Sequence, residues 1–458
     1  MYGIIVLAAY AVLMVLVTIL LSRRSQNTES FHVADRKLGL IQSAMSIAAT
    51  WIWAPALFTS AEKAYVNGTP GLFWFLVPNI LCLLLFIPFG RKIREQMPQG
   101  ITLSGYMADK YHSRSVHGVY LFELSALAVL STGVQLLAGA KILATVTGLP
   151  FWVLTVVLAI IAYSYSQYSG IKASVLTDAL QMVFMLGCCL LFVPWALSGD
   201  TGVSDLVHGL AGASGEYTHL FDRKGLEVFF AFGLPTAIGL FAAPFGDQCF
   251  WQRAFSIRKD KVGAAFKLGA ALFAIVPLSM GVLSFIAAGS GYVAQDTGLV
   301  NFELVTNLFP AWAMLPFLFM VISGLLSTAD SNLCAVASLT SDFGAGMKTA
   351  KGSMLALLVL AVGIANIPGL AVTDLFLIYG TLRATTMLPT VLTLKGKRLT
   401  AAGVTGGVLA SLFVGMPVFV AGTFAGNSAL KTVGCLSAVL LSGIVCMVTA
   451  PRKGVQQA

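Results

Sequence analysis

Long apolar runs recur along the whole chain, and they constrain its fold more than any other feature. A helix needs about 20 mainly apolar residues to cross the hydrocarbon of a bilayer. Because the backbone polar groups of a segment in lipid must be satisfied within that segment, each such run is predicted to form an α-helix. Thirteen runs are close to or above this length: residues 2–22, 41–66, 71–90, 117–147, 151–167, 170–197, 227–252, 263–290, 311–343, 352–368, 371–394, 401–424 and 429–449.

The composition agrees with this pattern, since 57% of the 458 residues are hydrophobic and only 10% are charged. Soluble domains carry roughly 25% charged residues. The sequence therefore predicts an all-α polytopic membrane protein with about 13 transmembrane helices. The lipid bilayer is the partner that this composition requires, and no pattern in the sequence indicates a nucleic acid or an obligate protein partner.

Basic residues are concentrated in every second loop between the runs, at residues 23–37, 91–114, 172, 253–261, 348–351, 395–398 and 452–453. The opposite loops hold only Lys63, Arg223, Lys224 and Lys431. By the positive-inside rule, the amino terminus is predicted to lie outside the cell membrane and the carboxyl terminus inside. The net charge of +9 then reflects topology rather than an acidic partner.

The ten runs that follow the first divide into two sets of five, residues 41–197 and 227–394, whose leading members cross in opposite directions. Two sets of five helices with opposite orientation are typical of an inverted repeat. An extra helix and loop (1–40), an outer loop (198–226) and two C-terminal helices with a short tail (395–458) would flank the repeats.

Helix-breaking residues interrupt the leading run of each set. Broken helices at corresponding positions indicate a binding site near the bilayer midplane, because unwinding frees carbonyls for a cation and helix ends for a substrate. The alternative interpretation is that Gly and Pro are simply commoner in membrane helices. The breakers are Ala54-Pro55 in the first set, and Gly233, Pro235, Gly239, Pro244 and Gly246 in the second.

Three hydroxyls and one carboxylate interrupt the apolar run 317–337. They belong to Ser327, Thr328, Ser331 and Asp330. An ionisable residue inside a membrane is costly and marks a functional site by default. In a helix, Ser327 lies three residues before Asp330 and four before Ser331, so one face offers a ladder of hard oxygen atoms. Such a face suits a small cation.

Four stretches resemble motifs of the sodium:solute symporter family (solute carrier 5-like), and they occur in the family's order. They are Phe31 to Gly39 (FHVADRKLG), Gly170 to Gln181 (GIKASVLTDALQ), Asp247 to Arg253 (DQCFWQR) and Ser327 to Leu333 (STADSNL). The resemblance extends along most of the chain. It implies a ten-helix (5+5) inverted-repeat symporter core with broken first and sixth core helices.

The resemblance also implies a sodium site between the first and eighth core helices. Na+ is a hard cation, and neutral oxygen atoms can replace its hydration without trapping it. The matching positions are the carbonyls of Ala49, Ile52 and Gly324 and the hydroxyls of Ser327 and Thr328.

Some family members use a second ion, and the matching positions here are Asp178, Asp330 and Ser331. Two carboxylates near one site would either hold a cation or share a proton, so coupling to H+ stays open. The alternative for Asp178 is an ion pair with Lys172 or Arg253.

The substrate cavity implied by the resemblance lies between the two broken helices and the second, third and tenth core helices. Aromatic walls with a few polar groups are typical of small-molecule pockets. Arg383 is an isolated cation in an apolar run; it either pairs with Asp374 or Glu123 or faces an anion. The candidate wall residues are Trp51, Trp53, Phe58, Phe73, Trp74, Gln135, Phe241, Asp247, Phe250, Tyr379 and Arg383.

Residues 49–57 and 65–74 are most similar to the urea-active transporter subgroup of that family. The sequence thus predicts a secondary active transporter for sodium-coupled symport of a small polar organic solute across the cytoplasmic membrane. A proton-coupled carrier of urea or polyamines and a passive solute channel are the alternatives. An enzyme is not expected, because neither H-E-x-x-H nor G-x-S-x-G occurs in the chain.

Overall fold

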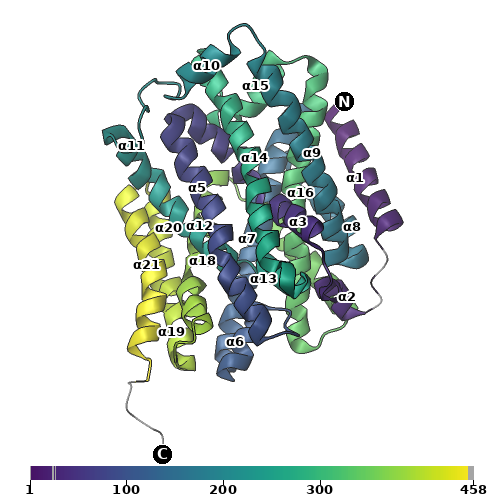
Figure 1. The fold of residues 1–458 in the computed structure, drawn as a ribbon, viewed down its shortest axis with the longest axis vertical. Helices are drawn as coiled ribbons and strands as arrows, with labels where there is room; N and C mark the ends of the chain where they lie inside the picture. The colour runs from purple at the N-terminus through teal and green to yellow at the C-terminus, as the bar shows by residue number, and fades with distance from the viewer. Residues whose placement is uncertain (1, 23–24, 26, 452–458) are drawn as a thin grey trace, which may run out of the picture.

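Helices that run along the long axis of the molecule make up most of the chain (Figure 1). The computed structural model describes all residues except 1, 23–24, 26 and 452–458. Four basic residues that the charge pattern assigns to inner loops, Arg23, Arg24, Arg452 and Lys453, lie outside the described residues. Helices α10 (Gly202–Gly209) and α15 (Val300–Leu308) lie at one end of the bundle, called the upper end because it is at the top of Figure 1.

Twelve helical segments of the described chain are long and apolar enough to cross a membrane. Helix α1 begins at the upper end and α21 ends at the lower end (Figure 1). The twelve segments are α1 (Tyr2–Leu21), α5 (Thr59–Gln96), α7 (Arg114–Thr147), α8 (Phe151–Ser169), α9 (Ile171–Leu197), α11 (Arg223–Val228) with α12 (Leu234–Gly246), α14 (Val262–Gly289), α16 (Met314–Leu339), α17 (Met347–Ala365), α18 (Val372–Leu394), α19 (Ala401–Ala410) with α20 (Met416–Phe424), and α21 (Ser428–Val448).

The remaining predicted run, residues 41–66, is divided among three helices and is therefore not one continuous helix. These are α3 (Leu40–Trp51), α4 (Ala54–Leu57) and the beginning of α5. Within α5, Gly68 adopts a left-handed backbone (φ 57, ψ −150), and this turn separates the end of one crossing from the next. A Cβ at Gly68 would lie 2.6 Å from the carbonyl oxygen of Leu210, so both its conformation and its close contact require glycine.

The first break lies at Ile52 and Trp53, just before the predicted Ala54-Pro55. Ile52 has a non-helical backbone (φ −83, ψ 77), and α4 begins with Pro55 in its first turn, where a missing N–H costs no hydrogen bond. The second break lies at Asp247, whose extended backbone (φ −95, ψ 113) separates α12 from α13 (Gln248–Ser256). Both broken helices predicted from Gly and Pro therefore exist.

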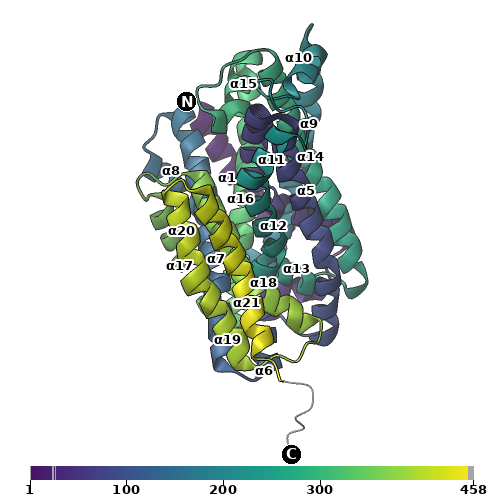
Figure 2. The ribbon, with the colours of Figure 1, turned by 90° about the vertical axis from the view of Figure 1, so that its left-hand side faces the viewer.

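Both breaks are enclosed by other helices of the bundle. Helix α14 packs along α5 and α3, α12 packs against α18, and α16 packs against α9, α7 and α3. Helices α19, α20 and α21 lie toward the viewer on one side of this core (Figure 2), while α17 packs against α7, α16 and α8. Large hydrophobic side chains are exposed on the outer helices, such as Leu20, Leu190, Val359 and Phe413. Such a surface is expected for a protein surrounded by lipid.

The structure also adds short helices outside the predicted runs. Residues 198–226, predicted as a polar loop, contain α10 and the beginning of α11. At the lower end lie α2 (Thr28–Val33) and α6 (Leu103–Tyr111). These segments close the ends of the bundle.

Candidate functional site

A small closed cavity of about 10 Å³ lies where the two helix breaks meet α7, α16 and α18. The broken helices position its walls, because Trp53 and Asp247 stand at the breaks themselves. The cavity is lined by Thr50, Trp51, Trp53, Ser131, Asp247, Cys249, Phe250, Thr328, Asn332, Tyr379 and Arg383.

Arg383 and Asp247 form a buried ion pair at this cavity. Arg383 Nε lies 3.1 Å from Asp247 Oδ1, and Arg383 Nη2 donates to Asp247 Oδ2. The hydroxyl of Tyr379 donates to the same carboxylate at 2.9 Å. The predicted pairing of Arg383 with Asp374 or Glu123 is therefore wrong. Sequence spacing could not reveal the true partner, because α12 and α18 are 136 residues apart at this contact.

Aromatic rings cover the guanidinium of Arg383. Its Cζ atom lies 5.1 Å from the ring centre of Trp53, 5.5 Å from that of Trp51 and 3.6 Å from that of Tyr379. The two indoles stack with centroids 5.8 Å apart, and Phe250 meets Trp51 edge-on at 5.2 Å. The side chain of Arg383 is thus held by a carboxylate and by three π faces, each of which favours its charge.

Several other candidate wall residues lie away from the cavity. Phe73 packs edge-on against Trp74, which in turn packs against Phe229 with ring centroids 4.6 Å apart. Phe241 is half-buried on α12 and does not line the cavity. The sequence placed these aromatic residues near the break, but helix rotation, which it did not reveal, turns them elsewhere.

Gln135 does not line the cavity but binds the backbone at the first helix break. Its Oε1 accepts a hydrogen bond from the backbone N–H of Ala54 at 2.8 Å, and its Nε2 donates to the carbonyl of Ser131 at 3.0 Å. The first N–H groups of a helix lack intrahelical partners. A side chain from α7 thereby satisfies one of these groups at the start of α4.

Sequence reasoning missed four lining residues: Thr50, Ser131, Cys249 and Asn332. Asn332 Nδ2 donates to Ser131 Oγ at 2.9 Å, which joins α16 to α7. A signal existed for both: Asn332 lies four residues after Thr328 and Ser131 four residues before Gln135, each on the face of a candidate residue.

The region predicted as a sodium site lies at the contact between the end of α3 and the middle of α16. Thr328 Oγ1 donates to the carbonyl of Thr50 at 2.9 Å. A Cβ at Gly324 would lie 3.0 Å from the carbonyl oxygen of Ile52, so glycine at this position lets the two helices approach. Ala49 lies about one helical turn before Ile52, and its carbonyl accepts a hydrogen bond from the N–H of Ile52 at 3.1 Å. The structure therefore brings these predicted residues into one region.

Below this region, Arg253 on α13 is bound by the residues predicted for a second ion. Arg253 Nη2 lies 3.0 Å from Asp178 Oδ2 and 2.7 Å from Ser331 Oγ. Both Arg253 and Asp178 are completely buried, at 1% and 0% exposure of their side chains. The ion pair that the sequence offered as an alternative for Asp178 is thus present with Arg253, whereas Lys172 pairs with Asp35 at 2.6 Å.

Hydroxyl groups complete this network. Arg253 Nε donates to Ser46 Oγ at 3.1 Å, and Ser46 Oγ donates to Asp178 Oδ2 at 2.5 Å. Ser327 Oγ donates a hydrogen bond to Asp178 Oδ1. Ser174 Oγ donates a hydrogen bond to Asp330 Oδ1 at 2.8 Å. The network thus holds two carboxylates, but one guanidinium contacts only the first of them.

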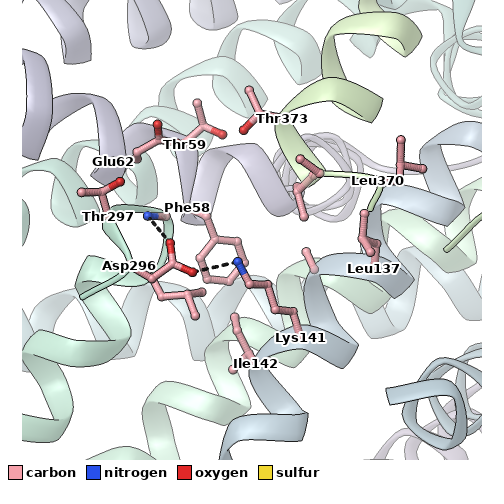
Figure 3. Close-up of a pocket in the computed structure, with 15 residues that line it drawn as sticks. Phe58, Thr59, Glu62, Leu137, Lys141, Ile142, Asp296, Thr297, Leu370 and Thr373 are labelled. Atoms are coloured by element: carbon pink, nitrogen blue, oxygen red, sulfur yellow. Dashed lines mark hydrogen bonds and ion pairs between the residues drawn. The ribbon is translucent and has the colours of Figure 1, made fainter. Parts of the chain in front are cut away.

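A larger cavity of about 330 Å³ opens near the upper end of the bundle (Figure 3). Phe58, which follows α4, lines this vestibule, whereas Trp53 before α4 lines the closed cavity. Lys141 Nζ on α7 forms an ion pair with Asp296 Oδ2 across the vestibule at 2.8 Å (Figure 3). Partial burial opposes ionisation of Asp296, but the hydrogen bond and charge of Lys141 and the N–H of Gly298 outweigh it, so its pKa lies below the ordinary value.

Among the described residues, no group of three or more His, Cys, Asp or Glu side chains is arranged to hold a metal ion. The polar groups at the helix breaks are instead carbonyls, hydroxyls and single carboxylates. Such ligands suit hard monovalent cations better than transition metals.

Comparison with known proteins agrees with this architecture. A model of the sodium:solute symporter family matches residues 31–415. Probable urea active transporter 1 of Schizosaccharomyces pombe is 26% identical over 74% of this chain and 55% of the relative. The urea-proton symporter DUR3 of Oryza sativa subsp. japonica is 24% identical over 92% of this chain and 65% of the relative. The chain therefore spans about half to two-thirds of the length of these relatives.

A solved structure has the same fold over its full length. It is a Na+-coupled sialic acid symporter in a substrate-bound outward-open state, which aligns with a TM-score of 0.78 and 16% identity over 99% of both chains. At this identity the likeness concerns the fold alone. Together with the all-helical bundle, it confirms the predicted fold class.

Proposed function

The chain belongs to the sodium:solute symporter family, and from this premise we propose that it is a secondary active transporter. It couples the entry of Na+ to the symport of a small polar organic solute by alternating access. The observation that carries the proposal is the meeting of two broken helices at a closed polar cavity, beside the contact of α3 with α16. The residues that line the central cavity are all buried, whereas Lys141 and Asp296 of the vestibule are partly exposed.

In this proposal, Na+ binds between α3 and α16. The break at Ile52 ends the regular hydrogen bonding of α3, so the last carbonyl groups of this helix are free to bind an ion, although that of Ala49 also accepts from the N–H of Ile52. The ligands are the carbonyls of Ala49, Ile52 and Gly324 and the hydroxyls of Ser327 and Thr328. The contacts of Thr328 with Thr50 and of Gly324 with Ile52 support this choice.

We assign one coupling ion to the cycle, not two. The positions for a second ion, Asp178, Asp330 and Ser331, surround the guanidinium of Arg253 or lie beside it. A tethered positive charge at this place supplies what a second cation would supply. The carboxylate of Asp330, which Arg253 does not contact, still gives the region an attraction for one mobile cation.

The vestibule faces the outside of the cell in this proposal, as the positive-inside rule predicts for the upper end. The two repeats, residues 41–197 and 227–394, would move relative to each other around the central cavity. Binding of Na+ favours the state in which the vestibule leads to the cavity, and release of Na+ inside allows the return. Such coupling requires that Na+ bind the two states with different affinity.

A proton-driven cycle is the second candidate. It is favoured by the name of the rice relative, a urea-proton symporter, and by the two buried carboxylates of the Arg253 network. The two candidates share the solute cavity and differ only in the ion.

Uptake into proteoliposomes tests the proposal and separates the candidates. Purified protein is reconstituted and given an inward gradient of Na+ at equal pH, or an inward proton gradient without Na+, with a panel of labelled uncharged and charged solutes. Accumulation above equilibrium with the Na+ gradient is the expected result. Linear flux that ignores both gradients would instead indicate a channel and overturn the proposal.

Variants at the sodium ligands sharpen this test. Ser327→Ala and Thr328→Ala should each raise the Na+ concentration for half-maximal uptake by about tenfold, as expected when one hydroxyl ligand is lost. Thr340→Ala removes a hydroxyl just after the lower end of α16, which donates to the carbonyl of Ala337, and serves as the matched control. Unchanged Na+ dependence in both site variants would remove them from the site.

A further inference from the structure

The imidazole of His32 is buried at the lower end of the bundle without a hydrogen-bond partner. His32 lies on α2 and is 1% exposed. Neither of its ring nitrogens, Nδ1 and Nε2, has a donor or acceptor within reach among the described residues. A neutral imidazole carries one N–H donor and one acceptor nitrogen, and both lose their bonds to water when the ring is buried unpaired. The packed position of this ring therefore costs free energy that hydrogen bonds do not offset.

Helix α2 packs against α13, the part of the second broken helix that lies below the break (Figure 1). Gln252 on α13 links three helices, because its Nε2 donates to the carbonyl of His32 at 2.7 Å and to the carbonyl of Cys334 on α16 at 3.1 Å. Its Oε1 is buried and has no partner in the described part of the chain. The next residue is Arg253, which binds Asp178. We call the contacts of Gln252 with His32 and Cys334 the inner junction.

The charged groups around α2 do not hold a proton on His32. Helix α2 packs against α9, α13, α16 and the turn of residues 34–36. The titratable and charged groups on α2 and on the lower parts of these elements are Glu29, Asp35, Arg36, Lys172, Asp178, Cys249, Arg253, Asp330 and Cys334. Six of them form the ion pairs Glu29–Arg36, Asp35–Lys172 and Asp178–Arg253, and Asp330 accepts a hydrogen bond from Ser174. Burial lowers the pKa of His32 from 6.5 to about 4, so the ring is neutral at neutral pH while the inner junction is closed.

Opening of the lower end changes the surroundings of this ring. In a cycle of alternating access, release of the solute inside requires the lower end to open. Because Gln252 ties α13 to α2, movement of α13 away from α2 breaks the inner junction and admits water to His32. An exposed imidazole has a pKa of about 6.5. A proton therefore binds the open junction more tightly than the closed one, and this difference shifts the equilibrium toward the open state.

We propose that the inner junction is a pH-sensitive gate, in which protonation of His32 favours the open state. This inference rests on the proposed function, because it places the gate on the path of solute release. Above pH 6.5 the ring is neutral in both states, so the closed junction keeps its full stability. That stability is lost as the pH falls from 6.5 toward 4, where the buried ring also binds a proton. Between pH 7.5 and 5.5, these two pKa values predict that the ratio of open to closed junctions rises about tenfold.

Hydrogen–deuterium exchange of the backbone amides of α2 measures the inner junction without transport. The purified protein in detergent and NaCl is labelled at pH 7.5 and at pH 5.5, and each rate is corrected for the intrinsic effect of pH on amide exchange. Protection of an amide reports the equilibrium of local opening. We expect the protection of α2 to be about tenfold lower at pH 5.5 than at pH 7.5. Equal protection at the two pH values would overturn the inference.

A His32→Asn variant separates the sensor from other effects of pH. Asparagine offers a donor and an acceptor, as the neutral imidazole does, but does not titrate, so its protection should be equal at the two pH values. The control is His112→Asn, because His112 is exposed at the end of α6 and has a left-handed backbone (φ 48) that asparagine tolerates. The control should show the full change of about tenfold. The same change in His32→Asn would assign the effect to another group and overturn the inference. His32→Gln gives the same comparison if asparagine prevents folding.

Solute exchange in proteoliposomes connects the inner junction with transport. Labelled solute exchanges across the membrane at equal Na+, equal solute and equal pH on both sides, so that no gradient drives it. The ratio of the rate at pH 5.5 to that at pH 7.5 should be up to about tenfold higher in the unchanged protein than in His32→Asn. Equal ratios would refute the role of the junction as a gate. If no solute is exchanged at either pH, the proposed symport fails, while hydrogen exchange still decides whether His32 senses pH.

Discussion

Replacing Arg253 by Gln should convert a one-ion network into one that binds a second cation. Arg253 Nη2 lies 3.0 Å from Asp178 Oδ2, and the two side chains are 1% and 0% exposed. Removing one partner of a buried ion pair leaves a bare charge and costs about 3–5 kcal/mol. Without added cations, the variant should therefore be much less stable than the unchanged protein.

Sodium should restore part of this loss. In the variant, Asp178 and Ser331 no longer contact a guanidinium, and together with the neighbouring Asp330 they can bind a cation. A ligand that binds only the folded state at a hundred times its Kd adds about 2.7 kcal/mol. The Na+-dependent gain in stability should thus be larger by about this amount in the variant, and the Hill slope for Na+ in uptake should rise from about one toward two, because each transport cycle then requires two bound Na+ ions.

Thermal inactivation in detergent measures the stability of each protein in choline chloride and its gain in NaCl at the same ionic strength. Na+-dependent uptake gives the Hill slope. Arg258→Gln is the control, because the ion pair of Arg258 with Asp260 is exposed and such pairs contribute at most about 1 kcal/mol. If Arg253→Gln is as stable as the control in choline, or gains no more from Na+ than the unchanged protein, the tethered-cation argument is wrong.

Three further changes give distinct outcomes. Asp178→Asn removes the partner of the guanidinium, so uptake should need about tenfold more Na+ at a Hill slope that stays near one; a slope of about two in the unchanged protein would contradict the single-ion assignment. Gln135→Met leaves the N–H of Ala54 without an acceptor and should cost about 1–3 kcal/mol in thermal inactivation, whereas an unchanged midpoint would show that the break does not need this bond. Lys141→Gln removes the ion pair with Asp296 and should cost up to about 1 kcal/mol at neutral pH, because both side chains are partly exposed. Since the pKa of Asp296 is lowered, that contribution is complete above the ordinary carboxyl pKa and is lost as the pH falls through the lowered value, so the two melting curves should converge there.

The sequence predicted the helices well because crossing lipid requires long apolar runs, and their length leaves little freedom. It also predicted both breaks from Gly and Pro, although the first lies at Ile52 and Trp53 rather than at Ala54-Pro55. It could not predict the orientation of side chains around each helix axis. Trp53 faces the cavity while Trp74 does not, and nothing in their local sequence distinguishes them.

The charged residues show the same division. That an Arg or Asp inside an apolar run must have a partner follows from the cost of a bare charge in lipid, and the sequence alone therefore marked Arg383 and Asp330 as important, while the family resemblance added Asp178. Which partner each takes depends on contacts between helices far apart in the chain, and only the tertiary structure decided it. Packing of α12 against α18 brings Asp247 to Arg383, and the break before α13 brings Arg253 to Asp178.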